Sequence, residues 1–165
     1  MKKQDDVPIC SGPSLLKDLA NELRRGQFGQ SQDQCAAICF RRRSDRETEV
    51  LLITSRDTGR WIIPKGWPMD GKTHCEAASI EACEEAGVRG KVEKNPFGYY
   101  SYLKKLNGGK SILCVVAVFL IEVMAMKKKF REKGQRTLVW LPFNEAAARV
   151  EEPELKGLLL KLGSK

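Results

Sequence analysis

Three glutamates, Glu81, Glu84 and Glu85, occur close together in a segment whose pattern predicts a helix. Because successive helical residues are about 100° apart, these side chains share one arc, and we expect them to project together, away from the packed face. Glu81 and Glu85 would repel each other as an i,i+4 pair, and Glu84 and Glu85 would lie at the negative end of the helix dipole. The compensating charge must come from outside the helix. A hard divalent cation such as Mg²⁺, which prefers oxygen ligands, is the simplest source.

An exposed acidic face that stays hydrated is the alternative interpretation of these glutamates. The preceding residues favour a built site instead. Residues 65–73 form a loop rich in glycine and proline, and Thr73 followed by Glu76 has the spacing of a capping box. The helix should therefore begin directly after this loop and end at Gly87.

The loop and helix together resemble the Nudix box, a pattern written G-x5-E-x7-R-E-U-x-E-E-x-G-U, where U is aliphatic. The matching residues are Gly66, Glu81, Ala82, Glu84, Glu85, Gly87 and Val88. Two positions depart from the pattern, because Lys72 stands in place of its first Glu and Ile80 in place of its Arg. In the family these two residues mainly brace the loop and helix, whereas the later glutamates hold metal.

The resemblance covers about residues 34–155 and is closest in order of segments to the diphosphoinositol polyphosphate phosphohydrolase branch of the Nudix superfamily. It implies a Mg²⁺-dependent hydrolase, with Mn²⁺ as an alternative ion, that cleaves a phosphoanhydride bond in a nucleoside or inositol polyphosphate. By position, Glu81 and Glu85 should hold the metal with the main chain near Lys65 or Gly66, and Glu84 should act as base or further ligand. A metal lowers the pKa of bound water, and a carboxylate within reach takes its proton.

The expected substrate-binding residues are basic or aromatic: Lys65, Lys72, Trp67, Arg41 and Arg43. The two lysines flank the expected phosphate site, the tryptophan lies in the loop between them, and the arginines lie in a hairpin turn that can reach a polyanion. The inositol-phosphate-cleaving relatives carry basic residues where this chain has Gln32-Asp33-Gln34. A dinucleoside polyphosphate therefore remains an equal candidate for the substrate.

Two other functions fit parts of the sequence. Residues 66–73 also satisfy the P-loop pattern G-x-x-x-x-G-K-[ST], which would indicate an NTPase. However, a P-loop cradles phosphates with successive N–H groups, and Pro68 has none while Trp67 is bulky. The second alternative is a Nudix-like module that binds RNA or another polyanion without turnover, which the two departures from the box would permit.

The composition limits the partners and the location. The 165 residues contain 29 Lys and Arg against 21 Asp and Glu, a formal net charge of +8, so we expect an anionic small-molecule polyphosphate as substrate and favour nucleic acid less. The longest apolar run, Ile112 to Ile121, is far shorter than the ~20 residues of a membrane span. The N-terminus is not a secretory signal and the six cysteines lack a C-x-x-C pair, which predicts a reduced, cytoplasmic protein.

The order of elements predicts one α/β (α+β) domain with a mixed β-sheet, and the resemblance implies an α/β/α sandwich with the glutamate helix packed on that sheet. We expect an N-terminal extension with a helix at 1–33, ending in a linker at 27–34, and the Nudix domain at 34–165. Asn107-Gly108-Gly109 predicts a hairpin, and Asn144 an N-cap. Strands are expected at 35–41, 50–54, 61–63, 92–103, 111–123 and 137–141, and helices at 74–86, 145–150 and 153–162.

Overall fold

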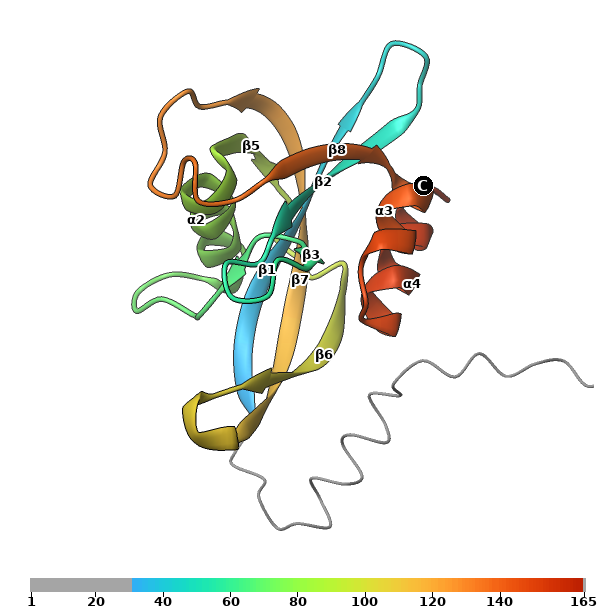
Figure 1. The fold of residues 1–165 in the computed structure, drawn as a ribbon. Helices are drawn as coiled ribbons and strands as arrows, with labels where there is room; N and C mark the ends of the chain where they lie inside the picture. Colours follow the sequence, from blue (N-terminus) through green and yellow to red (C-terminus); the bar gives the residue numbers. More distant parts are fainter. Residues whose placement is uncertain (1–30, 165) are drawn as a thin grey trace, which may run out of the picture.

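The structure, a computed structural model, describes residues 31–164 as one mixed sheet with helices on both of its faces (Figure 1). The helix expected within residues 1–33 lies outside the described residues. The strands are β1 (Gln32–Arg42), β2 (Thr48–Thr54), β3 (Trp61–Ile62), β4 (Lys65–Gly66), β5 (Val88–Val92), β6 (Gly98–Lys105), β7 (Ser111–Met126) and β8 (Leu138–Pro142). The helices are α2 (His74–Ala86), α3 (Phe143–Arg149) and α4 (Pro153–Leu162), with a 3₁₀ turn η1 (Asn107–Gly109) between β6 and β7.

The first strand, β1, is the centre of the sheet. It pairs in parallel with β7 and antiparallel with β2 and β4. β7 carries β5 and β6 on its other side, and β2 carries β3 and β8, all antiparallel. Both expected hairpins, β1–β2 and β6–β7, are therefore confirmed.

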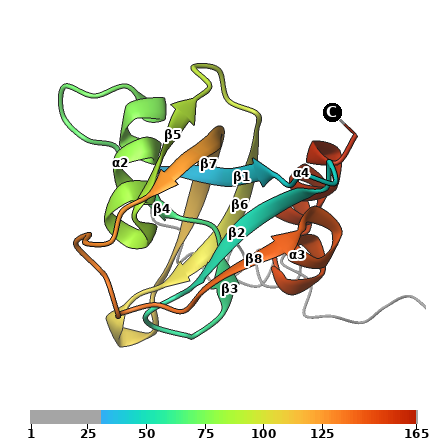
Figure 2. The ribbon, with the colours of Figure 1, turned by 90° about the horizontal axis from the view of Figure 1, so that it is seen from above.

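Alternate residues of β1 point to opposite faces of the sheet and enter two separate hydrophobic cores. Ala36 and Ile38 pack in the core under α3 and α4, whereas Cys35 and Ala37 pack in the core under α2. A strand buried on both faces reads as a continuous apolar run, which is what the sequence shows. Figure 2 shows α2 on one side of the sheet and α3 and α4 on the other, so the predicted α/β/α sandwich is confirmed.

The glutamate helix α2 has both predicted ends. The Thr73 side chain accepts from the Glu76 N–H while the Glu76 carboxylate accepts from the Thr73 N–H, which completes the capping box. At the other end Gly87 takes a left-handed conformation and its N–H donates to the carbonyls of Ala82 and Cys83. The alanines of the helix are buried and pack it on the sheet: Ala77, Ala78, Ala82 and Ala86.

Several expected boundaries are wrong. The single strand expected at 92–103 is two strands, β5 and β6, separated at Pro96, which has no N–H to donate to β7. The expected linker at 27–34 overlaps β1, because Gln34 is buried and accepts a hydrogen bond of 2.7 Å from the Tyr102 hydroxyl. Helix α3 begins at Phe143 after Pro142, so Asn144 is not its N-cap.

The cysteines in the described part of the chain are free, and three of them, Cys35, Cys39 and Cys114, are buried in the sheet. There they pack as small apolar side chains. Within residues 31–164, none of the helices combines the length and apolar content needed to span a membrane.

Replacing Gly87 by alanine should destabilise the fold more than the same change at Gly59. The two residues have nearly equal φ values, +71° and +69°, so each alanine costs about 1–2 kcal/mol of backbone strain. Only at Gly87 would the new Cβ also meet Phe130, at 2.5 Å, which adds about 1–3 kcal/mol of overpacking. Urea unfolding measures the difference, and equal losses for the two variants would contradict the contact.

Candidate active site

The carboxylate of Glu81 lies directly against Gly66. A Cβ on Gly66 would come within 2.1 Å of the Glu81 carboxyl carbon and of one of its oxygens. Only glycine leaves this space, and its backbone is fixed because β4 pairs with β1 through Cys35. The sheet and the helix thus bring Gly66, the first residue of the Nudix box pattern, into contact with Glu81, the first of the three glutamates on α2.

The Glu85 carboxylate is buried, with 6% of the residue exposed, so the expectation that it projects away from the packed face is wrong. One oxygen accepts a hydrogen bond of 3.0 Å from the Lys65 N–H, and the other forms an ion pair with Arg136. These two donors provide the physical reason for its burial, because a carboxylate leaves water only when it is paired.

The third glutamate, Glu84, remains partly exposed. Its carboxylate pairs at 2.9 Å with Arg131, whose side chain is 72% exposed. Its backbone carbonyl accepts a hydrogen bond of 3.0 Å from the Glu132 N–H, which attaches the loop between β7 and β8 to the end of α2. The compensating charge required by the sequence argument therefore comes partly from two arginines of that loop, Arg131 and Arg136.

The carboxylates remain undercompensated in spite of these arginines. Burial raises the pKa of Glu85 to about 7, although Arg136 and the Lys65 N–H act in the opposite direction. The charges of Glu81 and Glu132 add to the increase. Burial also raises the pKa of Glu81, followed by repulsion from Glu84 and Glu132. A cation bound beside these carboxylates would lower the pKa of both.

The available donors suit a hard cation held by few protein ligands. The donors are oxygens, and Glu85 uses two of the roughly four acceptor positions of a carboxylate, which leaves others free. Among residues 31–164, no three His, Cys, Asp or Glu side chains gather into a metal cage. Mg²⁺ does not require one, since it is commonly held by one or two carboxylates together with water and substrate phosphates. Glu81, Glu85 and the main chain at Gly66 fit that ion.

Two of the expected substrate-binding residues, Lys65 and Trp67, adjoin this group of carboxylates. The Lys65 ammonium lies 4.9 Å from the centre of the Tyr102 ring, and burial lowers the pKa of Lys65 while Glu85 opposes that decrease. Trp67 follows Gly66, is 39% exposed, and has the Lys104 ammonium 4.7 Å from its ring centre. Both residues flank Gly66 along the chain, but the Lys65 side chain lies with Tyr102 on the face of the sheet opposite α2, because its partner Ala36 belongs to the core under α3 and α4.

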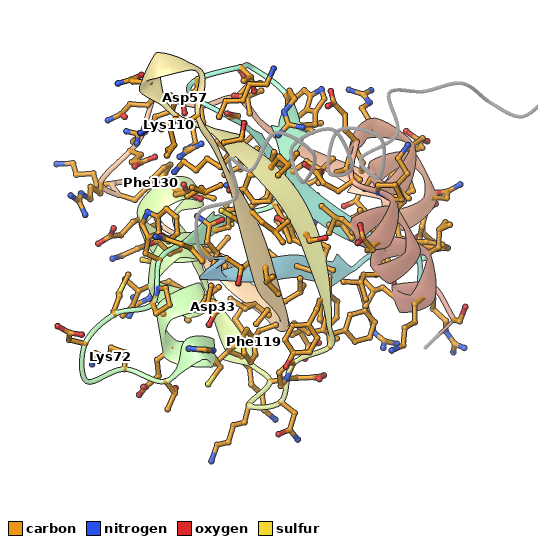
Figure 3. The ribbon with its side chains drawn as sticks, turned by 90° about the horizontal axis from the view of Figure 1, so that it is seen from below. Asp33, Asp57, Lys72, Lys110, Phe119 and Phe130 are labelled. Atoms are coloured by element: carbon orange, nitrogen blue, oxygen red, sulfur yellow. The ribbon has the colours of Figure 1, made fainter. Side chains whose placement is uncertain are left out.

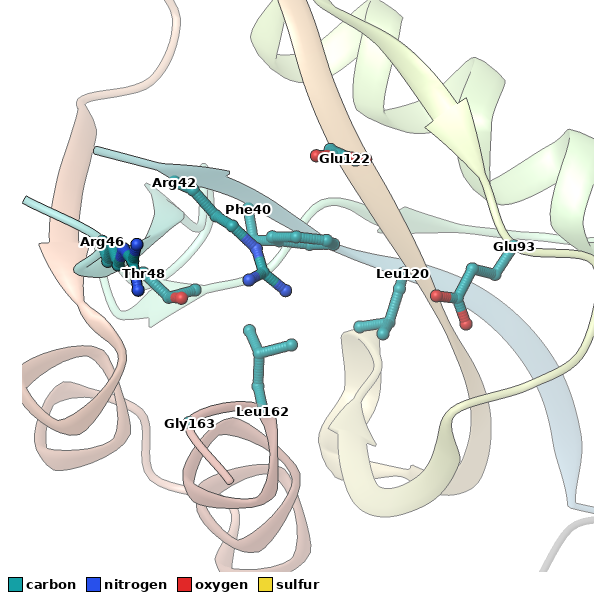
Figure 4. A pocket seen from close by; sticks show the side chains of 9 residues that line it. All are labelled: Phe40, Arg42, Arg46, Thr48, Glu93, Leu120, Glu122, Leu162 and Gly163. Atoms are coloured by element: carbon teal, nitrogen blue, oxygen red, sulfur yellow. The ribbon is translucent and has the colours of Figure 1, made fainter. Parts of the chain in front are cut away.

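The other three expected residues lie elsewhere. Arg41 and Arg43 are near the end of β1, about 20 Å along the strand from Cys35, and both pair with Glu49, at 2.7 and 3.4 Å. Lys72 lies on the outer part of the loop before α2 (Figure 3). The intervening Arg42 points instead into a cavity of about 330 Å³ beside Phe40, Leu120 and Leu162 (Figure 4).

The sequence does not identify Arg136 as the partner of Glu85, nor Tyr102 as the partner of Gln34. Arg136 is 51 residues away from Glu85, so no local pattern connects the two. The available signal was the charge balance, because three glutamates at a helix end require cations from another element. The charge balance shows that positive charge must come from outside the helix, but it does not show which residue provides it.

Comparisons with known proteins agree with this geometry. The family model described as NUDIX domain matches residues 33–162. The chain is 32% identical over 107 residues to Nudix hydrolase 13, mitochondrial, of Arabidopsis thaliana, covering 62% of this chain and 53% of that one. It is 47% identical over 78 residues to diphosphoinositol polyphosphate phosphohydrolase 3-alpha of Mus musculus, covering 47% and 46%. The chain thus spans about half the length of these curated relatives.

The fold comparison gives the same result. The crystal structure of a C. elegans Ap4A hydrolase binary complex matches with a TM-score of 0.60 and 18% identity, covering 81% of this chain and 96% of that one. At this identity the match establishes the fold only. The family match spans the segment that also satisfies the P-loop pattern, and there Thr73 caps α2, so the P-loop interpretation is set aside. With the box residues assembled as described and the family model covering most of the chain, the protein belongs to the Nudix family.

Proposed function

We propose that this protein hydrolyses a phosphoanhydride bond in an anionic nucleoside or inositol polyphosphate, with Mg²⁺ as its cofactor and Mn²⁺ as a substitute. The observation that carries the proposal is the buried, undercompensated carboxylate of Glu85 beside Glu81 and Gly66. A carboxylate buried only to form an ion pair would not need a second carboxylate nearby. A group of this kind, with the exposed Trp67 next to Gly66 in the chain, suits a metal–polyphosphate substrate.

Each glutamate has a proposed role. Glu81 and Glu85 hold the cation together with the main chain at Gly66. When bound, Mg²⁺ would neutralise charge on phosphate oxygens and lower the pKa of the attacking water. Glu84 is the proposed base, because its exposed partner Arg131 contributes little and leaves it able to accept a proton.

The proposed substrate-binding residues are Lys65, which brings positive charge to the phosphates, and Trp67, which offers a ring face to a nucleobase. The names of the relatives provide two substrate classes to test, inositol pyrophosphates and dinucleoside polyphosphates. Gln34 favours the second class, because its amide oxygen is occupied by the Tyr102 hydroxyl and it carries no charge for an inositol phosphate. Incubation with both classes, and anion-exchange separation of the products, would distinguish them.

The proposed location is a reducing compartment such as the cytoplasm, because the described cysteines are free and three are buried as apolar groups. The Arabidopsis relative carries the word mitochondrial in its name, which makes the mitochondrion the alternative. Fractionation of cells that express the protein would decide between the two compartments.

Replacing Glu81 by Gln should lower kcat/KM for the best polyphosphate substrate by about 10²–10³-fold, equivalent to the several kcal/mol that a metal ion contributes. The matched control is Glu76→Gln on the same helix, where glutamine still completes the capping box and activity should stay near wild type. Steady-state kinetics on both variants measure the effect. A loss of only a few-fold at Glu81 would contradict its assignment as a ligand.

Removal of divalent cations with EDTA should abolish turnover, and added Mg²⁺ or Mn²⁺ should restore it, because the proposed carboxylates act through the ion. Product formation before and after metal addition measures this. The opposite outcome, an absence of turnover with or without metal but tight binding of RNA in EDTA that weakens steeply with salt, would indicate a polyanion-binding module.

Replacing Trp67 by Ala should raise KM for a dinucleoside polyphosphate by about 5–150-fold, since stacking of a base on an aromatic ring contributes about 1–3 kcal/mol. KM for an inositol pyrophosphate should not change, because that substrate has no π face. Tyr99→Ala is the control, as Tyr99 is a 59% exposed aromatic residue on β6. Equal KM values for wild type and Trp67→Ala with the dinucleotide would remove Trp67 from the site.

A further inference from the structure

Arg136 is a buried arginine between two carboxylates and a carbonyl. Only 6% of its side chain is exposed. One terminal nitrogen pairs with Glu85, the other donates at 3.0 Å to the Thr54 carbonyl, and Nε donates at 2.8 Å to Glu132. Each of the three guanidinium nitrogens therefore has a partner, and since the guanidinium is rigid and planar, its orientation is fixed.

These partners come from three different elements. Thr54 ends β2, Glu132 lies in the loop between β7 and β8, and Glu85 lies in the last turn of α2. The second oxygen of Glu85 is held by the Lys65 N–H on β4. The position of this carboxylate is thus determined by strand β4 and by the loop before β8, and not by the helix alone.

The loop that carries Arg136 is attached to α2 at several points. The Lys127 N–H donates at 2.7 Å to the Gly87 carbonyl, and the Glu132 N–H donates at 3.0 Å to the Glu84 carbonyl. The Phe130 ring lies against Gly87. Because the loop cannot move far from the helix end, the contact of Arg136 with Glu85 is built into the fold.

Residue 80 of the helix is an isoleucine, so it has no charged group that could hold the Glu85 carboxylate in place of Arg136. Ile80 lines an open cavity of about 330 Å³ with Glu84, Phe130 and Arg131. Arg131 pairs with Glu84 there, but it is 72% exposed, and exposed ion pairs contribute little. Of the two loop arginines that pair with a glutamate of α2, only Arg136 is therefore buried enough to hold its partner carboxylate, that of Glu85, in one position.

We propose that Arg136 is a positioning residue that holds the Glu85 carboxylate beside Glu81 and Gly66 so that the pair can take a divalent cation. This inference rests on the proposed function. The competing account is that Arg136 only closes the loop onto the sheet, in which case its removal would leave metal affinity unchanged, or would strengthen it by removing a nearby positive charge.

The test compares Arg136→Lys and Arg136→Met with a matched control, Arg56→Met. Arg56 pairs with the same Glu132, at 3.5 Å, and with Gln135, at 3.2 Å, but its described partners include no glutamate of α2. Mn²⁺ affinity is measured by calorimetry without substrate, at temperatures well below each variant's own melting midpoint by circular dichroism. kcat and KM are then measured for the best substrate. Arg136→Lys keeps the charge, so it decides the question if Arg136→Met does not fold.

We expect Arg136→Lys to weaken Mn²⁺ binding by about 10–100-fold, as is typical when a residue that orients a metal ligand is changed. kcat should fall with KM nearly unchanged, and Arg56→Met should bind Mn²⁺ within about twofold of wild type. Wild-type or tighter Mn²⁺ binding by Arg136→Lys, with the wild-type protein active, would overturn the positioning role alone. A wild-type protein that neither binds Mn²⁺ nor hydrolyses any substrate would overturn the proposed function as well.

Discussion

The pairing of the buried Glu85 carboxylate determines how the rest of the site is assembled. A carboxylate at the negative end of a helix and out of water is unfavourable twice over, from the helix dipole and from desolvation. It is held by one N–H from β4 and one guanidinium from the loop before β8. Removing either donor would leave a buried charge unpaired, which is far more costly than losing a surface ion pair. The helix, the sheet and the loop are therefore bound together at the same atoms that face the proposed metal.

The sheet provides the rigidity that this arrangement needs. β1 is buried on both faces and lies between β7, β2 and β4. Because β4 pairs with β1, its two residues are held in place by the longest strands of the fold, β1 and β7. Because Gly66 has no side chain, the Glu81 carboxylate can then pack directly against its backbone. The proposed metal site therefore includes a two-residue strand whose own pairing contributes little, because the surrounding cores hold it.

The features that the sequence predicts well are local ones. The capping box at Thr73, the end of the helix at Gly87 and the apolar run of β1 each depend on residues a few positions apart, and all three are found. The break between β5 and β6 lies at a polar segment, Glu93 to Asn95, followed by Pro96, a turn signal that the expectation of one continuous strand overlooks. The burial of Glu85 and its pairing with Arg136 were missed because they depend on tertiary contact, and periodicity describes only the helix itself.

The loop of residues 67–72 joins two anchored points, the β4–β1 pairing at Gly66 and the cap at Thr73. Met69 packs against the core under α2, whereas Gly71 has a positive φ and open space around the position of a Cβ, so the loop is unpacked at that residue. Changes of length or composition there need not disturb the carboxylates, since both ends are fixed independently. The loop is thus a segment that protein engineers could diversify without rebuilding the framework that holds Glu81 and Glu85.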